Sequence, residues 1–185
     1  MKKIFTCLVF PVLFLSCFKK KENPPLPFPA ETQNGLNTFG CYVNGESFIP
    51  NTTLFGLVHP ITVHYNAVSN PYYKAGFLSI NGIDARYNLD FAGSIGIQKL
   101  PVFGTGEYSL SHVFNCGTSP YDCDGGAYYN AKEWKNYFIE TGKLTITKLD
   151  TINKIISGRF YFTAKDTLGN RKEITNGVFD TKYRF

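Results

Sequence analysis

The sequence predicts an all-β fold, either an antiparallel β-sandwich or a barrel-like domain, with room for one short helix. The chain of 185 residues contains 17 Phe and 12 Tyr, and aromatic residues favour strands. Its 17 Gly supply positions for tight turns. Alternating polar and apolar segments recur along the chain. Turn residues separate them at a spacing of roughly 8–12 residues, which is typical of sandwiches and barrels.

The first predicted element is a β-hairpin over residues 39–50. Asn44-Gly45 lies between two alternating segments, and such a pair forms two-residue turns because both residues tolerate positive φ. This turn places Cys41 opposite Phe48, with both side chains toward the core. We therefore interpret Cys41 as a buried thiol that behaves as a small apolar residue.

Alternation in the middle of the chain predicts four further strands. Residues 61–67 alternate, and His64 lies on their polar side. Residues 72–80 lead to a turn signal at Asn81-Gly82, and the stretch from 86 to 97 shows the clearest alternation in the chain. Residues 106–110 form a shorter strand.

The region that follows is less regular. Residues 111–130 contain many turn residues and two cysteines, so we expect an irregular loop there. Residues 130–138 fit either of two structures. Asn130 and Glu133 have the spacing of a capping box at the start of a short helix, and the same stretch suits a turn between two strands.

The C-terminal third predicts three strands. Residues 143–148, 158–164 and 179–185 each alternate between apolar and polar side chains. Turn residues at 150–154 and 168–170 connect them. Short strands joined by short turns support the antiparallel fold class.

The first 16 residues have the features of an export signal. Lys2 and Lys3 precede an apolar run over residues 4–15, which is shorter than the roughly 20 residues needed to span a bilayer. Phe14-Leu15-Ser16-Cys17 resembles the lipobox of bacterial lipoproteins, and this resemblance implies cleavage before Cys17 and attachment of acyl chains such as palmitate to it. We therefore expect a lipid anchor in the bacterial outer membrane, facing either the periplasm or the cell surface.

Residues 17–37 form the predicted tether, and residues 38–185 form a single β domain. Four prolines between residues 24 and 29 favour an extended polyproline conformation that holds the domain away from the lipid. Loss of Lys2 and Lys3 with the signal lowers the formal net charge from +5 to +3. So mild a charge argues against a nucleic-acid partner.

The cysteines agree with an oxidising compartment. Two of the five lie within the first 17 residues, which leaves an odd number in the β domain. Cys116 and Cys123 flank a turn-rich loop, so we expect a disulfide between them. In the loop-entropy model, closing so short a loop stabilises the fold by roughly 2.5 kcal/mol.

Several strand segments resemble a known group of proteins. The group consists of uncharacterised small lipoproteins from Bacteroidota-type bacteria, and the segments are Phe39 to Gly45, Gly142 to Asp150, Ile156 to Ala164 and Ile174 to Asp180. The resemblance implies a β-rich domain on a lipid anchor. It implies no activity and no catalytic residues.

No motif in the sequence predicts an enzyme, a cofactor or a metal site. The three histidines form no pair with the spacing of zinc ligands, and no Gly-x-Ser-x-Gly motif is present. Asp122 and Asp124 lack the further ligands of a calcium loop. We therefore expect a non-catalytic binding module, with a polysaccharide-acting hydrolase and a structural subunit of a surface assembly as alternatives.

Aromatic residues around the irregular region are the strongest indication of a binding site. Exposed rings provide rigid contact area for sugars and protein partners, and core packing is the other role open to these rings. The candidate contacts for a glycan or an envelope protein are Tyr121, Tyr128, Tyr129, Trp134 and Tyr137.

Two short motifs indicate modification. Asp150-Thr151-Ile152 and Asp166-Thr167-Leu168 resemble the Asp-Thr-aliphatic acceptor of O-glycosylation in Bacteroidota-type envelopes. Both lie in predicted exposed turns, where a modification would be accessible. Thr151 and Thr167 are therefore candidate O-glycosylation sites.

Overall fold

The computed structural model describes residues 27–52, 59–68, 75–85, 93–111 and 125–184. Every regular element in these ranges is a β-strand, so the all-β prediction is confirmed. No helix long and apolar enough to cross a membrane occurs in this part of the chain. The strands are β1 (Thr38–Val43), β2 (Glu46–Phe48), β3 (Asn51–Thr52), β4 (Ile61–Asn66), β5 (Phe77–Ala85), β6 (Gly93–Lys99), β7 (Gly106–Ser111), β8 (Gly125–Asn130), β9 (Lys135–Asp150), β10 (Ile155–Lys165) and β11 (Arg171–Lys182).

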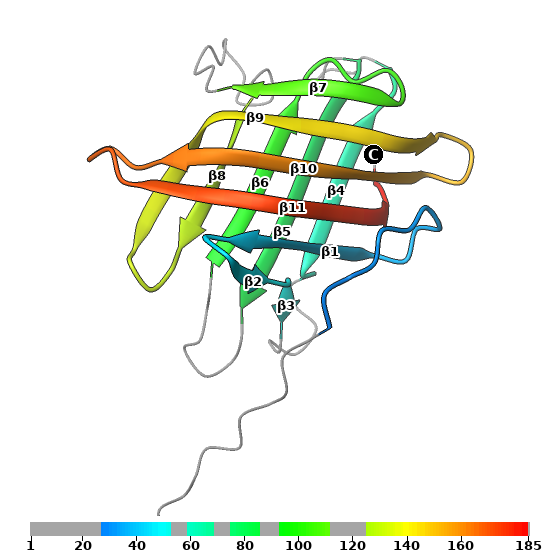
Figure 1. The fold of residues 1–185 in the computed structure, drawn as a ribbon. Coiled ribbons are helices and arrows are strands. Elements are labelled where there is room, and N and C mark those ends of the chain that lie inside the picture. Colours follow the sequence, from blue (N-terminus) through cyan, green and yellow to red (C-terminus); the bar gives the residue numbers. More distant parts are fainter. Residues whose placement is uncertain (1–26, 53–58, 69–74, 86–92, 112–124, 185) are drawn as a thin grey trace, which may run out of the picture.

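The strands join one sheet that curls into two layers. In Figure 1, β7, β9, β10, β11 and β1 form the front layer, and β8, β6, β5 and β4 cross behind them. The long strand β9 belongs to both layers. Its residues 135–138 pair with β8, and its residues 141–146 pair with β7 along the same edge. The sheet therefore divides at β9 and forms a half-barrel, in agreement with the predicted sandwich or barrel-like class.

The C-terminal end of the chain joins the two layers a second time. Beyond β11, Arg184 forms a parallel bridge with His64 of β4. The Arg184 N–H donates to the Val63 carbonyl at 2.9 Å, and the Tyr65 N–H donates to the Arg184 carbonyl at 3.1 Å. These bonds satisfy backbone groups of β4 on the side away from β5.

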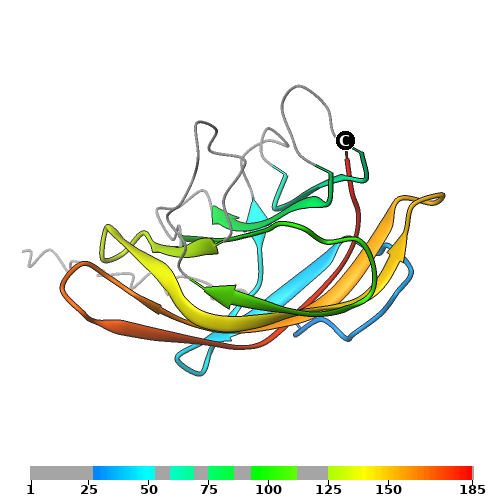
Figure 2. The ribbon, with the colours of Figure 1, turned by 90° about the horizontal axis from the view of Figure 1, so that it is seen from above.

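Nine aromatic rings contribute to the core cluster. Figure 2 shows the two layers from above. Alternation along β10 turns Phe160 and Phe162 inward, and both are 2% exposed. The Phe160 ring centroid lies 5.2 Å from that of Phe39 and 6.5 Å from that of Phe179. The same cluster contains aliphatic side chains from the back layer, including Leu78, Ile80, Ile95 and Ile97.

The predicted N-terminal hairpin is confirmed. Cys41 of β1 pairs with Phe48 of β2, and both side chains are buried. Asn44 and Gly45 have φ values of 49° and 84°, as the two-residue turn requires. Burial raises the pKa of the Cys41 thiol far above its ordinary value, so this thiol is not reactive in the folded chain.

The option of a short helix at residues 130–138 is wrong, and the turn between strands is correct. Asn130 ends β8 and Lys135 begins β9. One capping-box contact does form, because Asn130 Oδ1 accepts the N–H of Glu133 at 3.2 Å. The Glu133 carboxylate accepts the Asn130 side-chain amide at 2.8 Å, whereas a capping box uses the backbone N–H of that residue. They close a tight turn instead, and Trp134 leaves it with a positive φ of 55° that right-handed helices do not allow.

Two other sequence predictions need correction. The expected turn at Asn81-Gly82 is the middle of β5. Gly82 serves close packing, because a Cβ there would lie 2.9 Å from the rings of Phe39 and Pro50. The C-terminal part of the expected irregular region is the strand β8, where Gly126 lies so near the Gly96 carbonyl that a Cβ would lie 2.1 Å from its oxygen.

Candidate functional site

The outer face of the front layer carries the side chains that alternate with the core. Because Phe160 and Phe162 point inward, Arg159 and Tyr161 of β10 point outward, and Tyr161 is 53% exposed. The pairing of β10 with β11 shifts register between Phe160 and Phe162. Figure 2 shows that these strands curve around the back layer with their convex side outward.

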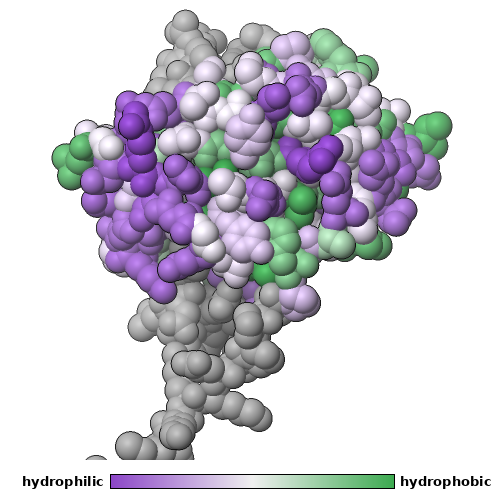
Figure 3. Space-filling model, in the orientation of Figure 1, coloured by the Kyte–Doolittle hydropathy of each residue, from purple (hydrophilic) through white to green (hydrophobic). Residues whose placement is uncertain are grey.

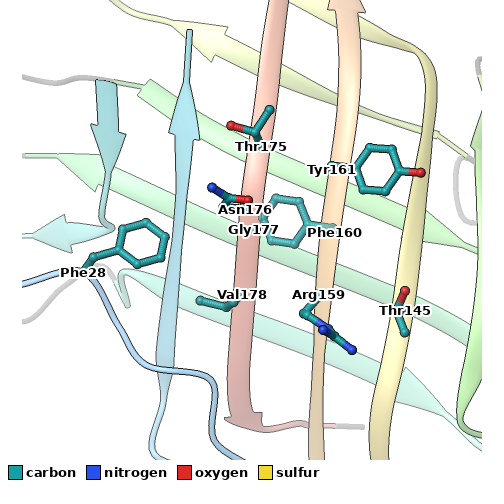
Figure 4. A pocket seen from close by; sticks show the side chains of 9 residues that line it. All are labelled: Phe28, Thr145, Arg159, Phe160, Tyr161, Thr175, Asn176, Gly177 and Val178. Carbon is teal, nitrogen blue, oxygen red and sulfur yellow. The ribbon is translucent and has the colours of Figure 1, made fainter. Parts of the chain in front are cut away.

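A groove of about 430 Å³ crosses this face from β9 over β10 and β11. Phe28 lies at one side of it, and Tyr161 lies at the other (Figure 4). The space-filling view in Figure 3 shows apolar and weakly polar surface in the middle of this face, with strongly hydrophilic surface on either side of it. The polar and charged side chains lining this outer groove are Thr145, Arg159, Thr175 and Asn176.

The register shift between β10 and β11 shapes the polar part of the groove. Phe160 pairs with Gly177 and Phe162 with Ile174, so two residues of β11 face one residue of β10. The extra residue is accommodated by a positive φ of 51° at Asn176. As a result, both Thr175 and Asn176 are exposed beside Tyr161.

The N-terminal segment, residues 27–37, packs on the domain and supplies Phe28 to the groove. The Phe28 ring stacks on Tyr42 of β1, with centroids 4.7 Å apart and planes inclined by 10°. Pro29 packs over Gly40, where a Cβ would lie 2.7 Å from the proline ring. Four residues of this segment, which lies within the predicted tether, therefore contact the sheet: Phe28, Pro29, Thr32 and Gly35.

A buried carboxylate holds the N-terminal segment in place. Asp180 is 1% exposed, and it accepts hydrogen bonds from the Thr32 hydroxyl at 2.6 Å, the Gly35 N–H at 2.8 Å and the Asn34 N–H at 3.0 Å. The Ser157 hydroxyl donates to it from β10 at 2.7 Å. Burial works to raise the pKa of Asp180, but the hydrogen bonds outweigh it, and the net shift is below the ordinary value.

One ion pair connects the N-terminal segment with the groove. The Nε of Arg159 lies 3.4 Å from Oε1 of Glu31, and both side chains are more than a third exposed. Among the described residues that line the groove, Arg159 is the one that carries a charge. The groove therefore combines two aromatic rings, hydroxyl and amide groups, and a single cation.

The aromatic residues predicted from the sequence do not share one surface. Tyr128 and Tyr137 are 6% and 1% exposed and belong to the core, with ring centroids 6.0 Å apart. Burial raises the pKa of Tyr128 to about 12. Neither ring can present its face to a ligand, so core packing accounts for these two. Tyr129 is half-buried, and Tyr121 lies outside the described residues.

Trp134 is the exception in that group. It is 83% exposed at the turn between β8 and β9. The turn beneath it is fixed, because the Tyr137 hydroxyl and the Lys172 ammonium both donate to Glu133. Trp134 therefore forms a protruding contact separate from the residues that line the groove.

Thr151 and Thr167 occupy similar turns. Both are exposed, and the aliphatic residues that follow them, Ile152 and Leu168, are 90% and 78% exposed. In each turn the preceding aspartate accepts backbone N–H groups, at 3.1 Å from Ile152 and at 2.9 Å from Leu168. The expectation that both threonines lie at accessible turns agrees with this geometry.

The remaining predicted sites lie elsewhere. Cys17, Cys116 and Cys123 are outside the described residues, so the structure does not test the lipid anchor or the disulfide. Within the described ranges, no group of three or more His, Cys, Asp or Glu side chains is arranged to hold a metal ion.

The groove was not predicted from the sequence. The available signal was Tyr161, an aromatic residue on the polar side of an alternating strand together with Arg159 and Thr163. Phe28 gave no such signal, because it lies in a proline-rich stretch that suggested a solvated tether.

A comparison with protein families gives one match. The family model described as "Domain of unknown function (DUF6252)" matches residues 63–181, more than half of the chain. No curated protein and no solved structure matches the chain. The matched range contains Arg159 and Tyr161, and it excludes Phe28 and Glu31.

Proposed function

We propose a saccharide-binding function for this chain, which belongs to the family of domains of unknown function DUF6252. In this proposal the outer groove is the binding site, and the domain is held at the bacterial outer membrane by acyl chains on Cys17. The observation that carries the proposal is the pairing of Phe28 and Tyr161 across a groove with hydroxyl, amide and guanidinium groups between them.

The chemistry of the groove suits sugars. The C–H faces of a pyranose ring pack on flat aromatic rings, and its hydroxyls need hydrogen-bonding partners beside those rings. Phe28 is already ordered by its stack on Tyr42, so little conformational entropy is lost when a ligand packs against it. Thr145, Thr175 and Asn176 offer both donors and acceptors.

The residues that line the groove support binding rather than hydrolysis. Glycoside hydrolysis generally requires two carboxylates that flank the scissile bond. The described residues lining the groove include no Asp or Glu. Glu31, which contacts Arg159 from beside the groove, is a single carboxylate and not a flanking pair.

Binding of oligosaccharides to the purified full chain in detergent tests the proposal. Screening on a glycan array and titration calorimetry should identify a ligand. Tyr161→Ala and Phe28→Ala should each lower its affinity by about 3- to 10-fold, since an aromatic contact contributes roughly 0.5–1.5 kcal/mol beyond its buried area. Trp134→Ala is the matched control, because Trp134 is an exposed aromatic residue outside the groove.

The outcomes separate the alternatives. Loss of binding only in Trp134→Ala would move the site to the turn between β8 and β9. Release of shorter products from the ligand would indicate a hydrolase. No binding across the array would refute a saccharide function and would favour a structural or protein-binding role.

The proposed anchor has its own test. Intact mass spectrometry of the chain from a membrane fraction should show cleavage before Cys17 and the mass of added acyl chains. An unmodified N-terminus in the soluble fraction would refute the lipid anchor, and it would leave the groove proposal unaffected.

A further inference from the structure

Arg159 gives the outer groove a single fixed positive charge. Its guanidinium lines the groove beside Tyr161, and the other lining residues are uncharged. A guanidinium binds carboxylates through two parallel N–H donors, a geometry that a neutral sugar hydroxyl cannot match. The charge therefore favours one class of sugar over the others.

Glu31 places a carboxylate on that guanidinium from within the same chain. The contact is a single approach of Oε1 to Nε at 3.4 Å, with side-chain exposures of 39% for Glu31 and 57% for Arg159. Exposed pairs of this kind are weak, because solvent screens them and both long side chains lose freedom. A ligand carboxylate can therefore replace Glu31 at small cost.

The backbone around Glu31 is held from both sides. Phe28 and Pro29 are fixed on β1 by the stack with Tyr42 and the contact with Gly40. Thr32 is fixed by its hydrogen bond to Asp180. Glu31 lies between these two points, so its side chain can swing away from Arg159 while the segment stays on the sheet.

We propose that the outer groove binds acidic saccharides, such as uronic-acid oligosaccharides, and that Glu31 is an internal substitute for the ligand carboxylate. The proposal rests on the saccharide-binding function above. Arg159 determines the preference for acidic ligands in this scheme. Glu31 lowers the affinity for them until they displace it, and it keeps the groove electrically neutral when no ligand is bound.

Variants that replace a charged side chain by neutral Gln test the proposal. The probes are tetragalacturonate and a neutral galactose tetrasaccharide, titrated into the full chain in detergent. We expect the acidic probe to bind at least about 10-fold more tightly than the neutral one, because hydrogen bonds between charged partners are about twice as strong as neutral ones. Arg159→Gln should remove this preference, because it should weaken binding of the acidic probe far more than binding of the neutral one.

Glu31→Gln should have the opposite effect. Removing a weak exposed competitor should raise the affinity for tetragalacturonate by about 2- to 5-fold. In the double variant Arg159→Gln with Glu31→Gln, the gain should disappear, because Glu31 acts only through Arg159. Arg184→Gln is the control, since Arg184 is an exposed arginine in a different hollow of about 250 Å³ next to β4.

The outcomes distinguish failure of the acidic preference from failure of the saccharide-binding function. If both tetrasaccharides bind equally and Arg159→Gln changes neither, the acidic preference is refuted and the saccharide function stands. If Arg184→Gln alone removes the preference, the acidic ligand binds at the other hollow and the proposal is overturned. If neither these probes nor any array saccharide binds, the saccharide function itself fails. The three substituted side chains, Arg159, Glu31 and Arg184, are exposed, so unchanged thermal unfolding will show that each variant is folded.

Discussion

Replacing Asp180 with Asn should release the N-terminal segment from the sheet. The carboxylate accepts hydrogen bonds from Thr32, Asn34 and Gly35 of the segment and from Ser157 of β10. An amide of the same shape replaces one acceptor oxygen by a donor, so at least one of these donors loses its partner. Hydrogen bonds to a charged group contribute about 1.5–3 kcal/mol. Water can form hydrogen bonds with the released segment and offset part of the loss. We therefore expect the free energy of unfolding to fall by about 2 kcal/mol.

Urea denaturation measures the change in the free energy of unfolding, and amide hydrogen exchange locates it. We expect faster exchange at Asn34 and Gly35 in Asp180→Asn, with the amides of β5 and β6 unchanged. Glu46→Gln, at an exposed position of β2, is the control for removing a carboxylate. Wild-type stability together with wild-type exchange at residues 34 and 35 would refute the role assigned to Asp180.

The same carboxylate makes the attachment of the segment dependent on pH. The folded-state pKa of Asp180 is lower than its ordinary value of 3.8, so the folded chain binds its proton less readily than the unfolded chain does. The resulting stabilisation is fully present above the ordinary pKa, and it is lost as the pH falls through the lower folded-state value. Exchange at residues 34 and 35 should accelerate over that acidic range in the wild type and show no such step in Asp180→Asn.

Three further predictions follow from close packing, burial and turn geometry. Gly126→Ala should destabilise the fold by more than about 2 kcal/mol in urea denaturation, because the added Cβ meets a backbone oxygen. Gly104→Ala, with open space around it, should change stability by less than about 0.5 kcal/mol. Cys41 should resist alkylation until the chain unfolds, as peptide mass spectrometry will show, and rapid labelling of the native chain would contradict its burial. If Thr151 and Thr167 are O-glycosylated, the intact mass of the envelope-derived chain should fall by one glycan in each Thr→Ala variant, and a mass without glycan would exclude both sites.

Local signals in the sequence predicted the fold class and several elements. The Asn44-Gly45 hairpin was correct because a two-residue turn fixes its own register. Alternation predicted β10, because its inner and outer faces differ sharply in polarity. Asn81-Gly82 was wrongly predicted to be a turn. The sequence does not distinguish a turn glycine from a strand glycine that packs against Phe39 and Pro50.

The elements that the sequence did not predict depend on distant partners. β8 is rich in glycine and has little alternation, and it is a strand because it lies between β6 and β9. The anchor of the N-terminal segment joins Thr32 to Asp180, which are 148 positions apart. The outer groove also depends on distant parts of the chain, since Phe28 and Tyr161 line it together only when the N-terminal segment lies on the sheet.

The division of the groove between two parts of the chain bears on how its specificity is determined. The family match spans residues 63–181, so it includes Arg159 and Tyr161, and Phe28 and Glu31 come from outside it. The sheet thus supplies the cation and one ring, and the N-terminal segment supplies the second ring and the competing carboxylate. Because Asp180 fixes that segment through hydrogen bonds from four of its residues, the sheet also determines where the segment lies. If the groove binds saccharides as proposed, substitutions of Phe28 and Glu31 should alter ligand preference, and the half-barrel should keep its core and its strand pairing.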